Sequence, residues 1–320
     1  MTRFRILILL LAALAGRSMQ AQVAELRRLI EETPRLELES VPLGARMANA
    51  SSLGTVSSVA SDGKGIVYVL QRGDKADPVI AVDTQGRVLR SWGKGMFTVP
   101  HSIRVDADGN IWTVDAGSSV LLKFTPQGRK LQEIDVGEVA TGSECAFPTL
   151  CGTTDVTFGP AGRLFISDGY GNARILEYTG DGKRVKVWGS KGTAPGQFQI
   201  PHGIAFDGKV LYVADRTNAR VQRFDLDGRY LGEWTHLGRP FALQFTSGAL
   251  WVALMTLEAG AGAKASPWIL KVDPATGKVL GQIEAPGPHS IDVTAAGEMF
   301  ASGCCGGSNP MSFYWLQKSR

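Results

Sequence analysis

The stretch PHSIRVDADGNIWTVD, residues 100–115, decides the fold: an apolar run, a turn containing Asp and Gly, and a second run in which apolar and polar residues alternate. This order is typical of a β-hairpin and not of a helix. Five further copies of the unit begin at Val56, Thr153, Pro201, Pro240 and Pro288. A unit that recurs at a near-constant spacing predicts a repeat architecture, in which each copy packs on the next.

Each clear copy is followed by a third apolar run, such as NARILEYTGDG or NARVQRFDLDG, and several copies have a fourth, such as KRVKVWGS. Four short strands per unit, separated by turns, form one blade of a β-propeller. We therefore predict an all-β fold, a six-bladed β-propeller with four-stranded antiparallel blades, over residues 51–320. The last copy lacks a visible fourth strand, and residues 36–41 of the N-terminal segment 22–50 are expected to supply it, which would close the ring.

The N-terminus, MTRFRILILLLAALAGRSMQAQ, has the layout of a signal peptide. Arg3 and Arg5 precede an apolar run from Ile6 to Ala15, and small and polar residues follow. A positive region, a short apolar region and a cleavable stretch are typical of an export signal. The run is shorter than the roughly 20 apolar residues of a spanning helix. We predict a signal peptide over residues 1–21 and a periplasmic or secreted protein without stable membrane association after cleavage; an uncleaved anchor is the alternative.

The charges argue against a nucleic-acid partner. The chain has 34 basic and 30 acidic residues and a net charge of +4, and its basic residues are scattered. Without a basic patch there is no electrostatic footprint for nucleic acid. We expect a monomer that acts on a small molecule.

Export would permit disulfides among the four cysteines, which are Cys145, Cys151, Cys304 and Cys305. Four cysteines allow three pairings, and the sequence does not choose among them. Cys145 and Cys151 are near enough in the chain to close a small loop. A bridge between the adjacent Cys304 and Cys305 would strain the peptide that joins them.

Three of the four histidines occupy one position of the repeat. They are His101, His202 and His289, in the segments PHSI, PHGI and PHSI at the entrance to the first strand of the second, fourth and sixth blades. First strands line the channel of a propeller, so these positions lie about 120° apart and their imidazoles converge. The other blades carry Ser57, Thr154 and Phe241 at this position. Three histidines with an open fourth position suit catalytic zinc; the alternative is that histidine fills a structural slot of the repeat.

Other recurring polar residues are expected to be structural. Aspartates end the second strand of three blades, and arginines follow in the NAR segments of two of them. The residues concerned are Asp115, Asp168, Asp215, Arg174 and Arg220. We interpret the aspartates as turn residues and the arginines as ties between strands or blades. His236 lacks the context of the other histidines and is expected at the surface.

The segments DGYGNARILEY and DRTNARVQRF resemble the NHL repeat. The stretch from Val99 to Trp234 resembles the peptidyl-α-hydroxyglycine α-amidating lyase family, and the likeness extends more weakly back to Arg72 and forward to His289. The motifs that carry it are QRGD at 71–74, PHSI with GNIWTVD, TDVTFGPAGRLFISDGYGNARI, PGQFQIPHGIAF and VADRTNARVQRF.

This resemblance implies a zinc-dependent lyase that splits the N–Cα bond of a C-terminal α-hydroxyglycine and releases a peptide amide and glyoxylate. It implies that the three channel histidines hold zinc and that Tyr170, of SDGY, and Arg72, of RGD, are the catalytic pair. Arg216, of ADR, would line the site, and it or Arg72 would grip the substrate carboxylate. In that chemistry zinc acidifies the substrate hydroxyl, and Tyr170 takes its proton.

The sequence departs from the family pattern in three places. The animal lyase has a calcium site with an aspartate directly after the third histidine; here that residue is Ser290, and Asp292 follows two residues later, so structural calcium stays an open question. A family cysteine after the tyrosine is Gly171 here, so its bridge to the position of Cys151 cannot form, and Cys145 becomes a candidate partner. This chain also lacks the hydroxylating partner domain, so we expect that another hydroxylated N-acyl compound can serve as substrate.

Two other classes of function compete with a lyase. A non-catalytic NHL propeller, acting outside the cytoplasm as a binding or sensor module, would need no zinc and would tolerate loss of Tyr170 or Arg72. A lactonase-like hydrolase would hold calcium with a ring of acidic and amide ligands, and the sequence offers no such ring.

Overall fold

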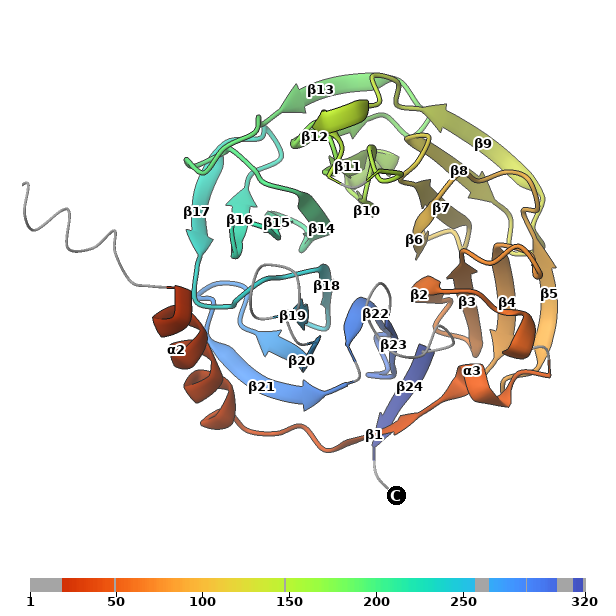
Figure 1. Cartoon of the computed structure of the whole chain (residues 1–320), viewed down its shortest axis with the longest axis horizontal. Helices are drawn as coiled ribbons and strands as arrows, with labels where there is room; N and C mark the ends of the chain where they lie inside the picture. Colours follow the sequence, from red (N-terminus) through yellow and green to blue (C-terminus); the bar gives the residue numbers. More distant parts are fainter. Residues whose placement is uncertain are drawn as a thin grey trace, which may run out of the picture.

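Six four-stranded antiparallel sheets stand as blades around a central channel (Figure 1). In five of them the strands follow one another in sequence from the inner to the outer edge, and the sixth combines strands from both ends of the chain. This is the six-bladed β-propeller that the repeat predicts. The computed structural model describes residues 19–48, 50–146, 148–256, 265–285, 287–303 and 313–318.

The strands of the first three blades come directly after one another in the chain. Blade 1 contains β2 (Val56–Ser61), β3 (Ile66–Gln71), β4 (Val79–Asp83) and β5 (Val88–Trp92). Blade 2 contains β6 (Pro100–Val105), β7 (Ile111–Asp115), β8 (Val120–Phe124) and β9 (Lys130–Asp135). Blade 3 contains β10 (Asp155–Phe158), β11 (Leu164–Asp168), β12 (Arg174–Tyr178) and β13 (Arg184–Trp188).

The remaining three blades complete the ring. Blade 4 contains β14 (Pro201–Phe206), β15 (Leu211–Asp215), β16 (Arg220–Phe224) and β17 (Tyr230–Trp234). Blade 5 contains β18 (Ala242–Thr246), β19 (Ala249–Thr256), β20 (Ala265–Val272) and β21 (Val279–Glu284). Blade 6 contains β22 (Pro288–Val293), β23 (Met299–Gly303), β24 (Phe313–Lys318) and β1 (Leu38–Val41).

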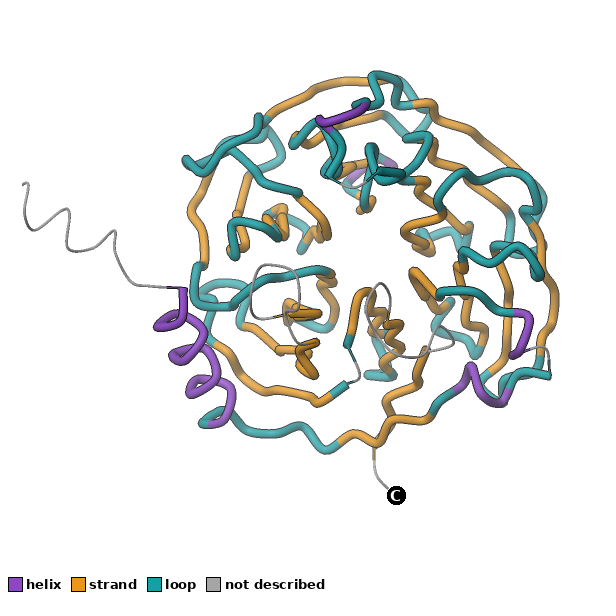
Figure 2. The backbone as a smooth tube through the Cα atoms, in the orientation of Figure 1, coloured by secondary structure: helices purple, strands orange, loops and turns teal. Residues whose placement is uncertain are grey.

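The N-terminal segment closes the ring. The strand β1 pairs with β24, with Leu38 opposite Lys318 and Val41 opposite Trp315, and so forms the outer strand of blade 6 as expected for residues 36–41. Pairing the first strand of the chain with the last covers the edge of β24 and gives blade 6 four strands like the other blades. Before it, the helix α2 (Met19–Glu31) lies against the outside of the ring (Figure 2).

Short helical elements complete the chain. They are α3 (Leu43–Arg46) and the 3-10 turns η1 (Ala50–Ser52), η2 (Gly142–Glu144) and η3 (Pro160–Gly162). The apolar side of α2, with Leu26 and Ile30 buried, packs on blades 4 and 5 near Trp234 and Leu250. Burying this stripe is what holds an amphipathic helix to the propeller.

The hydrophobic core lies between the blades. The second strands β7 and β15 are buried along their whole length, because neighbouring blades cover both of their faces. Outer-strand tryptophans join successive blades: Trp92 of β5 packs on the hairpin of blade 2, where a Cβ added to Gly128 would lie 2.8 Å from the indole. Trp188 of β13 meets Gly228 of blade 4 in the same way. These contacts fix the angle between blades and hence the shape of the channel.

Several predictions from the sequence fall outside the described residues. The predicted signal peptide, residues 1–21, lies there except for its last residues, which belong to α2. Cys304 and Cys305 also lie outside the described residues, and the sequence predicted no pairing for them. Among the described residues, none of the helices combines the length and apolar character needed to cross a membrane.

Candidate metal centre

Each channel histidine sits at an irregularity near the start of its blade. The pairing of β6 with β7 shifts between Pro100 and Ser102, and that of β22 with β23 shifts between Pro288 and Ser290. In β14 the corresponding shift follows Pro201. A β-bulge re-aims the side chain at the irregularity, and the proline before it lacks the N–H that a regular ladder would use. The repeated PH(S/G)I segment thereby turns its histidine into the channel.

The side chains of His101, His202 and His289 converge on one point. One ring nitrogen from each lies within 4.8 Å of the other two, and the ring centroids are 4.9 to 5.2 Å apart. All three residues are only 2–3% exposed. Within the described part of the chain, no other group of three or more His, Cys, Asp or Glu residues offers ligand atoms in this way. The fold therefore brings together three positions that are about a hundred residues apart in sequence.

A backbone carbonyl of the next blade holds each imidazole in place. The distance from Nδ1 to the carbonyl oxygen is 2.6 Å for His101 and Thr154, 2.7 Å for His202 and Phe241, and 2.9 Å for His289 and Ser57. A carbonyl oxygen only accepts hydrogen bonds, so each Nδ1 carries the proton and donates it, and each Nε2 keeps its lone pair. Ordering of imidazoles by hydrogen bonds at the far nitrogen is characteristic of metal-binding histidines.

The environment keeps the imidazoles uncharged. Burial, followed by the charges of the neighbouring rings and arginines, lowers the pKa of His101 and His202 well below the usual 6.5. Burial and then Arg72 lower the pKa of His289 to about 3. The neutral form is the one that binds a metal ion.

Tyr170 reaches the histidines from the turn between β11 and β12. Its hydroxyl oxygen lies 2.9 Å from Nε2 of His101 and 3.1 Å from Nε2 of His202. The tyrosine is 3% exposed, and its ring meets both imidazoles edge-on. The hydroxyl has a single proton, so it can donate to only one of these two nitrogens at a time.

The donor set therefore fits a metal cation. Three neutral imidazoles direct lone pairs toward one region, and the phenol supplies one proton to share among them. A cation bound by the three Nε2 atoms would satisfy these lone pairs, and three histidines with room for a further ligand are a known zinc arrangement. The carbonyls on Nδ1 would be its outer hydrogen bonds.

Two arginines approach the cluster from opposite sides of the ring. Arg72 follows β3 of blade 1 and Arg216 follows β15 of blade 4, at the same position of the repeat. Their backbone N–H groups make equivalent bonds, to the carbonyls of Thr55 and Ile200 respectively. Nε of Arg72 donates to the carbonyl of Pro100 at 2.8 Å. Blades 1 and 4 lie opposite one another in the ring of six blades, so the two guanidinium groups approach the histidines from opposite sides.

The arginines give this side of the channel a positive charge. Arg216 is 6% exposed, and its guanidinium carbon lies 4.8 Å from the centre of the Phe241 ring and 5.6 Å from that of Tyr170. Cation–π contacts of this kind hold a guanidinium in place without neutralising it. Burial lowers the pKa of Arg72, and both burial and Arg216 lower that of Arg239. An anionic group is what such a surface attracts.

A buried ion pair lines the channel on the far side of the histidines. Arg104 donates to both carboxylate oxygens of Asp155, at 3.0 and 2.5 Å. Asp292 accepts a hydrogen bond of 3.0 Å from a glutamine amide of blade 5, and Oγ of Ser290 lies 2.8 Å from that of Ser58. The carboxylates of Asp155 and Asp292 are thus bound by protein donors. Beyond Arg104 the channel widens into a cavity of about 600 Å³.

The recurring aspartates and arginines have structural roles, as predicted. Asp115 accepts bonds from two backbone N–H groups of the preceding loop, at 2.5 and 2.9 Å. Nε of Arg174 donates to Asp168, and Nε of Arg220 donates to Asp215, both at 2.8 Å. The three aspartates are at most 1% exposed, so they are buried anchors of the turns.

The pairing of two cysteines and the place of the fourth histidine are also resolved. Cys145 and Cys151 form a disulfide, which is one of the pairings that the sequence left open. His236 is exposed, and its Nε2 lies 2.8 Å from the carbonyl oxygen of Gly277, away from the other three histidines.

Sequence reasoning missed two features of the centre. The residues that replace histidine on alternate blades supply the carbonyls that orient the imidazoles, and no side-chain pattern reveals a backbone role. The shared repeat position of Arg72 and Arg216, directly after a Gln or Asp that ends a second strand, was visible in the aligned repeats as QR and DR.

Comparisons with known proteins find similarity to NHL-repeat proteins and to amidating lyases. The NHL repeat family model matches residues 198–224. Over 232 residues, 62% of this chain, the sequence is 32% identical to the mouse protein named peptidyl-glycine alpha-amidating monooxygenase, of which it covers 24%. Over 228 residues, 60% of this chain, it is 30% identical to the Drosophila melanogaster peptidyl-alpha-hydroxyglycine alpha-amidating lyase 1, of which it covers 42%.

A further relative has a name without an activity. The mouse NHL repeat-containing protein 3 is 34% identical over 212 residues, which are 60% of this chain and 59% of that protein. The chain thus spans less than two thirds of the length of each of these relatives. The family resemblance noted from the sequence is confirmed as a similarity: the chain forms a six-bladed propeller, matches the NHL repeat over residues 198–224 and is similar to proteins named as amidating lyases.

Solved structures share the fold at low sequence identity. Virginiamycin B lyase from Staphylococcus aureus superimposes with a TM-score of 0.56 at 18% identity, covering 83% of this chain and 81% of that one. A protein described as a putative gluconolactonase gives a TM-score of 0.60 at 15% identity, covering 90% of this chain and 94% of the other. At such identities the likeness concerns the propeller alone.

Proposed function

We propose that this NHL-repeat propeller, related to the amidating lyases, is a zinc-dependent lyase. It would cleave the N–Cα bond of a C-terminal α-hydroxyglycine, or of a similar N-acyl carbinolamide, to give an amide and glyoxylate. The observation that carries the proposal is the arrangement of Tyr170, whose hydroxyl lies within hydrogen-bond distance of Nε2 of both His101 and His202. A phenol can accept and donate a proton, and here it lies next to three histidines that could bind a metal ion.

The proposed metal is zinc, held by His101, His202 and His289. Three neutral imidazoles with a free coordination position are typical of catalytic zinc. Bound there, zinc would act as a Lewis acid that polarises the substrate's oxygen and favours loss of its hydroxyl proton.

Tyr170 would move the proton. The reaction removes the proton of the carbinol hydroxyl, the oxygen's electron pair forms the aldehyde C=O, and the C–N bond breaks with its electrons passing to nitrogen. The nitrogen then needs one proton, so the overall change is a proton transfer from oxygen to nitrogen without oxidation or reduction. Tyr170 would accept the first proton and return it to the leaving amide nitrogen.

Arg72 and Arg216 would bind the carboxylate of the substrate. They approach the histidines from opposite sides, and the guanidinium of Arg216 packs on the Tyr170 and Phe241 rings. Guanidinium groups bind carboxylates with two parallel hydrogen bonds. A carboxylate fixed there would bring the adjacent carbinol carbon next to Tyr170.

We further propose that the mature protein is a monomer in the periplasm or outside the cell, acting on a peptide C-terminus or a small molecule and on no nucleic acid. The disulfide between Cys145 and Cys151 supports an oxidising compartment. The predicted signal peptide agrees with such a location.

A binding or sensor module is the second candidate. The relative named only for its NHL repeats is 34% identical, so likeness at this level extends to proteins whose names give no enzymatic activity. A module of this kind would retain the fold without needing Tyr170.

Metal analysis and an activity assay on the same preparations test the proposal. We expect about one equivalent of zinc in the purified wild type and in a control, His236→Ala, and little in His202→Ala. With α-hydroxyhippurate, wild type and control should release glyoxylate and benzamide in equal amounts. Absence of a tightly bound transition metal from the wild type would overturn the metal centre. A zinc-loaded wild type that releases no glyoxylate would overturn the lyase and favour the binding module.

A further inference from the structure

The turn that carries Tyr170 is hydrogen-bonded to a neighbouring loop. The loop, residues 136–152, connects the outer strand of blade 2 to the inner strand of blade 3. The backbone N–H of Ala146 donates to the carbonyl of Tyr170 at 2.6 Å, and the N–H of Tyr170 donates to the carbonyl of Gly152 at 3.1 Å. Both backbone polar groups of the tyrosine are therefore bonded to this loop.

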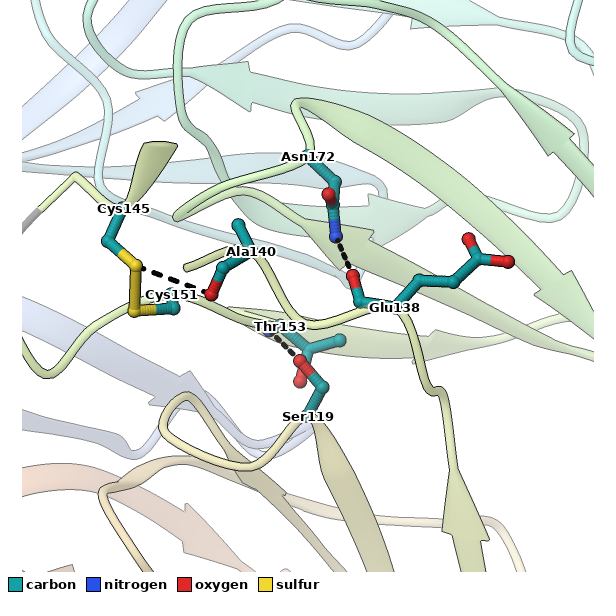
Figure 3. Close-up of a disulfide and its surroundings, with 7 residues drawn as sticks. All are labelled: Ser119, Glu138, Ala140, Cys145, Cys151, Thr153 and Asn172. Carbon is teal, nitrogen blue, oxygen red and sulfur yellow. Dashed lines mark hydrogen bonds between the residues drawn. A yellow bond between two sulfur atoms is a disulfide. The ribbon is translucent and has the colours of Figure 1, made fainter. Parts of the chain in front are cut away.

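The disulfide joins the two parts of the loop that make these bonds. Cys145 precedes Ala146 and Cys151 precedes Gly152 in the chain, so the disulfide joins the neighbours of both hydrogen-bonding residues. Figure 3 shows the bridge between the two cysteines. The bridge closes a segment with a sequence separation of 6, which leaves the donor and the acceptor little freedom to separate.

Close packing and a side-chain hydrogen bond also hold the same turn against the loop. A Cβ added to Gly171 would lie 2.1 Å from Cβ of Ala140 and 2.6 Å from the carbonyl oxygen of Cys151, so the loop and turn touch without a side chain between them. Nδ2 of Asn172 donates to the carbonyl of Glu138 at 2.8 Å (Figure 3). The loop thus contacts the turn at Tyr170 and at the two residues after it.

We propose that the disulfide-closed loop 136–152 is a positioning device for Tyr170, with Cys145, Cys151 and Gly171 as its positioning residues. The role assigned to the tyrosine rests on the proposed function. The hydroxyl must stay near two histidine nitrogens, and a displacement of about 1 Å at a reacting group is enough to slow catalysis by up to about a hundredfold. The arginines and two of the three histidines stand on other blades, so loosening the loop leaves metal and carboxylate binding in place.

Hydrogen exchange tests the device without reference to activity. In the double variant Cys145→Ser/Cys151→Ser, the amides of residues 168–174 should exchange at least tenfold faster than in the wild type. The equivalent turn of blade 4, residues 215–220, is the internal control and should be unchanged. The variant leaves Cys304 and Cys305 intact, and a reductant added to it should have no further effect on residues 168–174. Equal exchange in both proteins would overturn the proposal.

Kinetics then show whether the device acts through the tyrosine. We expect kcat of the double variant to fall about tenfold or more, with zinc content and KM unchanged. In the Tyr170→Phe background, loss of the disulfide should cause no further fall in the residual rate, since residues that act through one another are not additive. An equal further fall in that background would show a merely structural role and overturn the proposal.

A second variant covers the case in which the cysteine variant is too unstable to assay. Gly171→Ala keeps the disulfide and pushes the loop away from the turn, and the double variant Ala140→Gly/Gly171→Ala removes one of the two clashing atoms. The single variant should lose turnover and the double variant should recover part of it. If the wild type has no lyase activity, only the proposed function is overturned. The hydrogen-exchange experiment would still test whether the loop holds the turn that carries Tyr170.

Discussion

The turns of blades 3 and 4 are built on the same plan but are fastened in different ways. In both, an arginine at the start of the third strand donates through Nε to the aspartate that ends the second strand, at 2.8 Å in each case. An asparagine between them bonds the same aspartate at 2.9 and 2.8 Å. In both, the alanine before the arginine has a positive φ, 53° and 52°. The shared sequence NAR therefore specifies one turn geometry.

The difference lies in how the adjoining loop is held. In blade 4, the guanidinium of Arg220 donates to three carbonyls of its loop, at 2.7 to 3.0 Å. The side chains of Asn218 and Gln222 bond the same loop. In blade 3, Arg174 reaches the exposed carboxylate of Glu138 instead, and a disulfide closes the loop.

Blade 3 also has one more residue between its aspartate and its arginine than blade 4 has. That longer turn carries Tyr170, whereas the shorter one carries Arg216. An identical repeat motif can therefore support different functional residues when the loop outside the motif helps to hold the turn in place.

The largest effect should separate the functional residues of the two turns. We expect Tyr170→Phe to lower kcat about 10²- to 10⁴-fold with zinc retained, because it removes the proton carrier. Arg216→Met should instead raise KM about tenfold or more through loss of a charge-assisted hydrogen bond. Steady-state kinetics of glyoxylate release, with the exposed Arg229→Met as control, would measure both. The same pattern of change in kcat and KM for the two variants would contradict distinct roles.

The next effect concerns the two arginines of the NAR segments. Arg220→Met leaves the buried Asp215 without its ion pair and releases three loop carbonyls, so we expect a loss of about 3–5 kcal/mol in the free energy of unfolding. Arg174→Met loses contacts with one buried and one exposed carboxylate and should cost less, about 1–3 kcal/mol. Denaturant unfolding of the two variants compares them. A larger loss of unfolding free energy for Arg174→Met than for Arg220→Met would show that the disulfide does not help to hold the loop of blade 3.

We expect a smaller loss of stability, of the same size for each variant, when either of the two asparagines is replaced. Asn172→Ala and Asn218→Ala each remove a bond to a buried aspartate and a bond to a loop carbonyl, so each should cost about 1 kcal/mol of stability. Matching shifts in Tm would confirm that the turns share one design. A loss confined to one variant would break the equivalence.

The smallest effect is a pH dependence confined to blade 3. Arg174 and then Arg184 lower the pKa of Glu138 below its usual 4.5. A carboxyl whose pKa is lower in the folded state stabilises the fold above its unfolded pKa, and this contribution is lost as the pH falls through the folded pKa. The Tm of the wild type should therefore exceed that of Glu138→Gln at neutral pH, and the difference should vanish in strong acid. A difference that persists there would rule out the ion pair as its cause.

Much of the centre was predictable because a residue's place in the repeats determines its blade, and hence its angle around the central channel. Once PHSI and PHGI were aligned as the entrance to a first strand, the convergence of His101, His202 and His289 followed from the symmetry of the ring. Tyr170, Arg72 and Arg216 were reached only through family resemblance, because nothing in periodicity says where a side chain in a turn points.

The sequence by itself determined the blades, their number and the three histidine positions, because strand alternation and repeat spacing are local and periodic properties. Only the tertiary structure decided how the imidazoles are oriented, since their partners are the backbone carbonyls of Ser57, Thr154 and Phe241, and every residue type has a carbonyl. It also decided that Cys145 pairs with Cys151 and that the loop they close is hydrogen-bonded to Tyr170, because those contacts depend on distances between segments that no local pattern encodes.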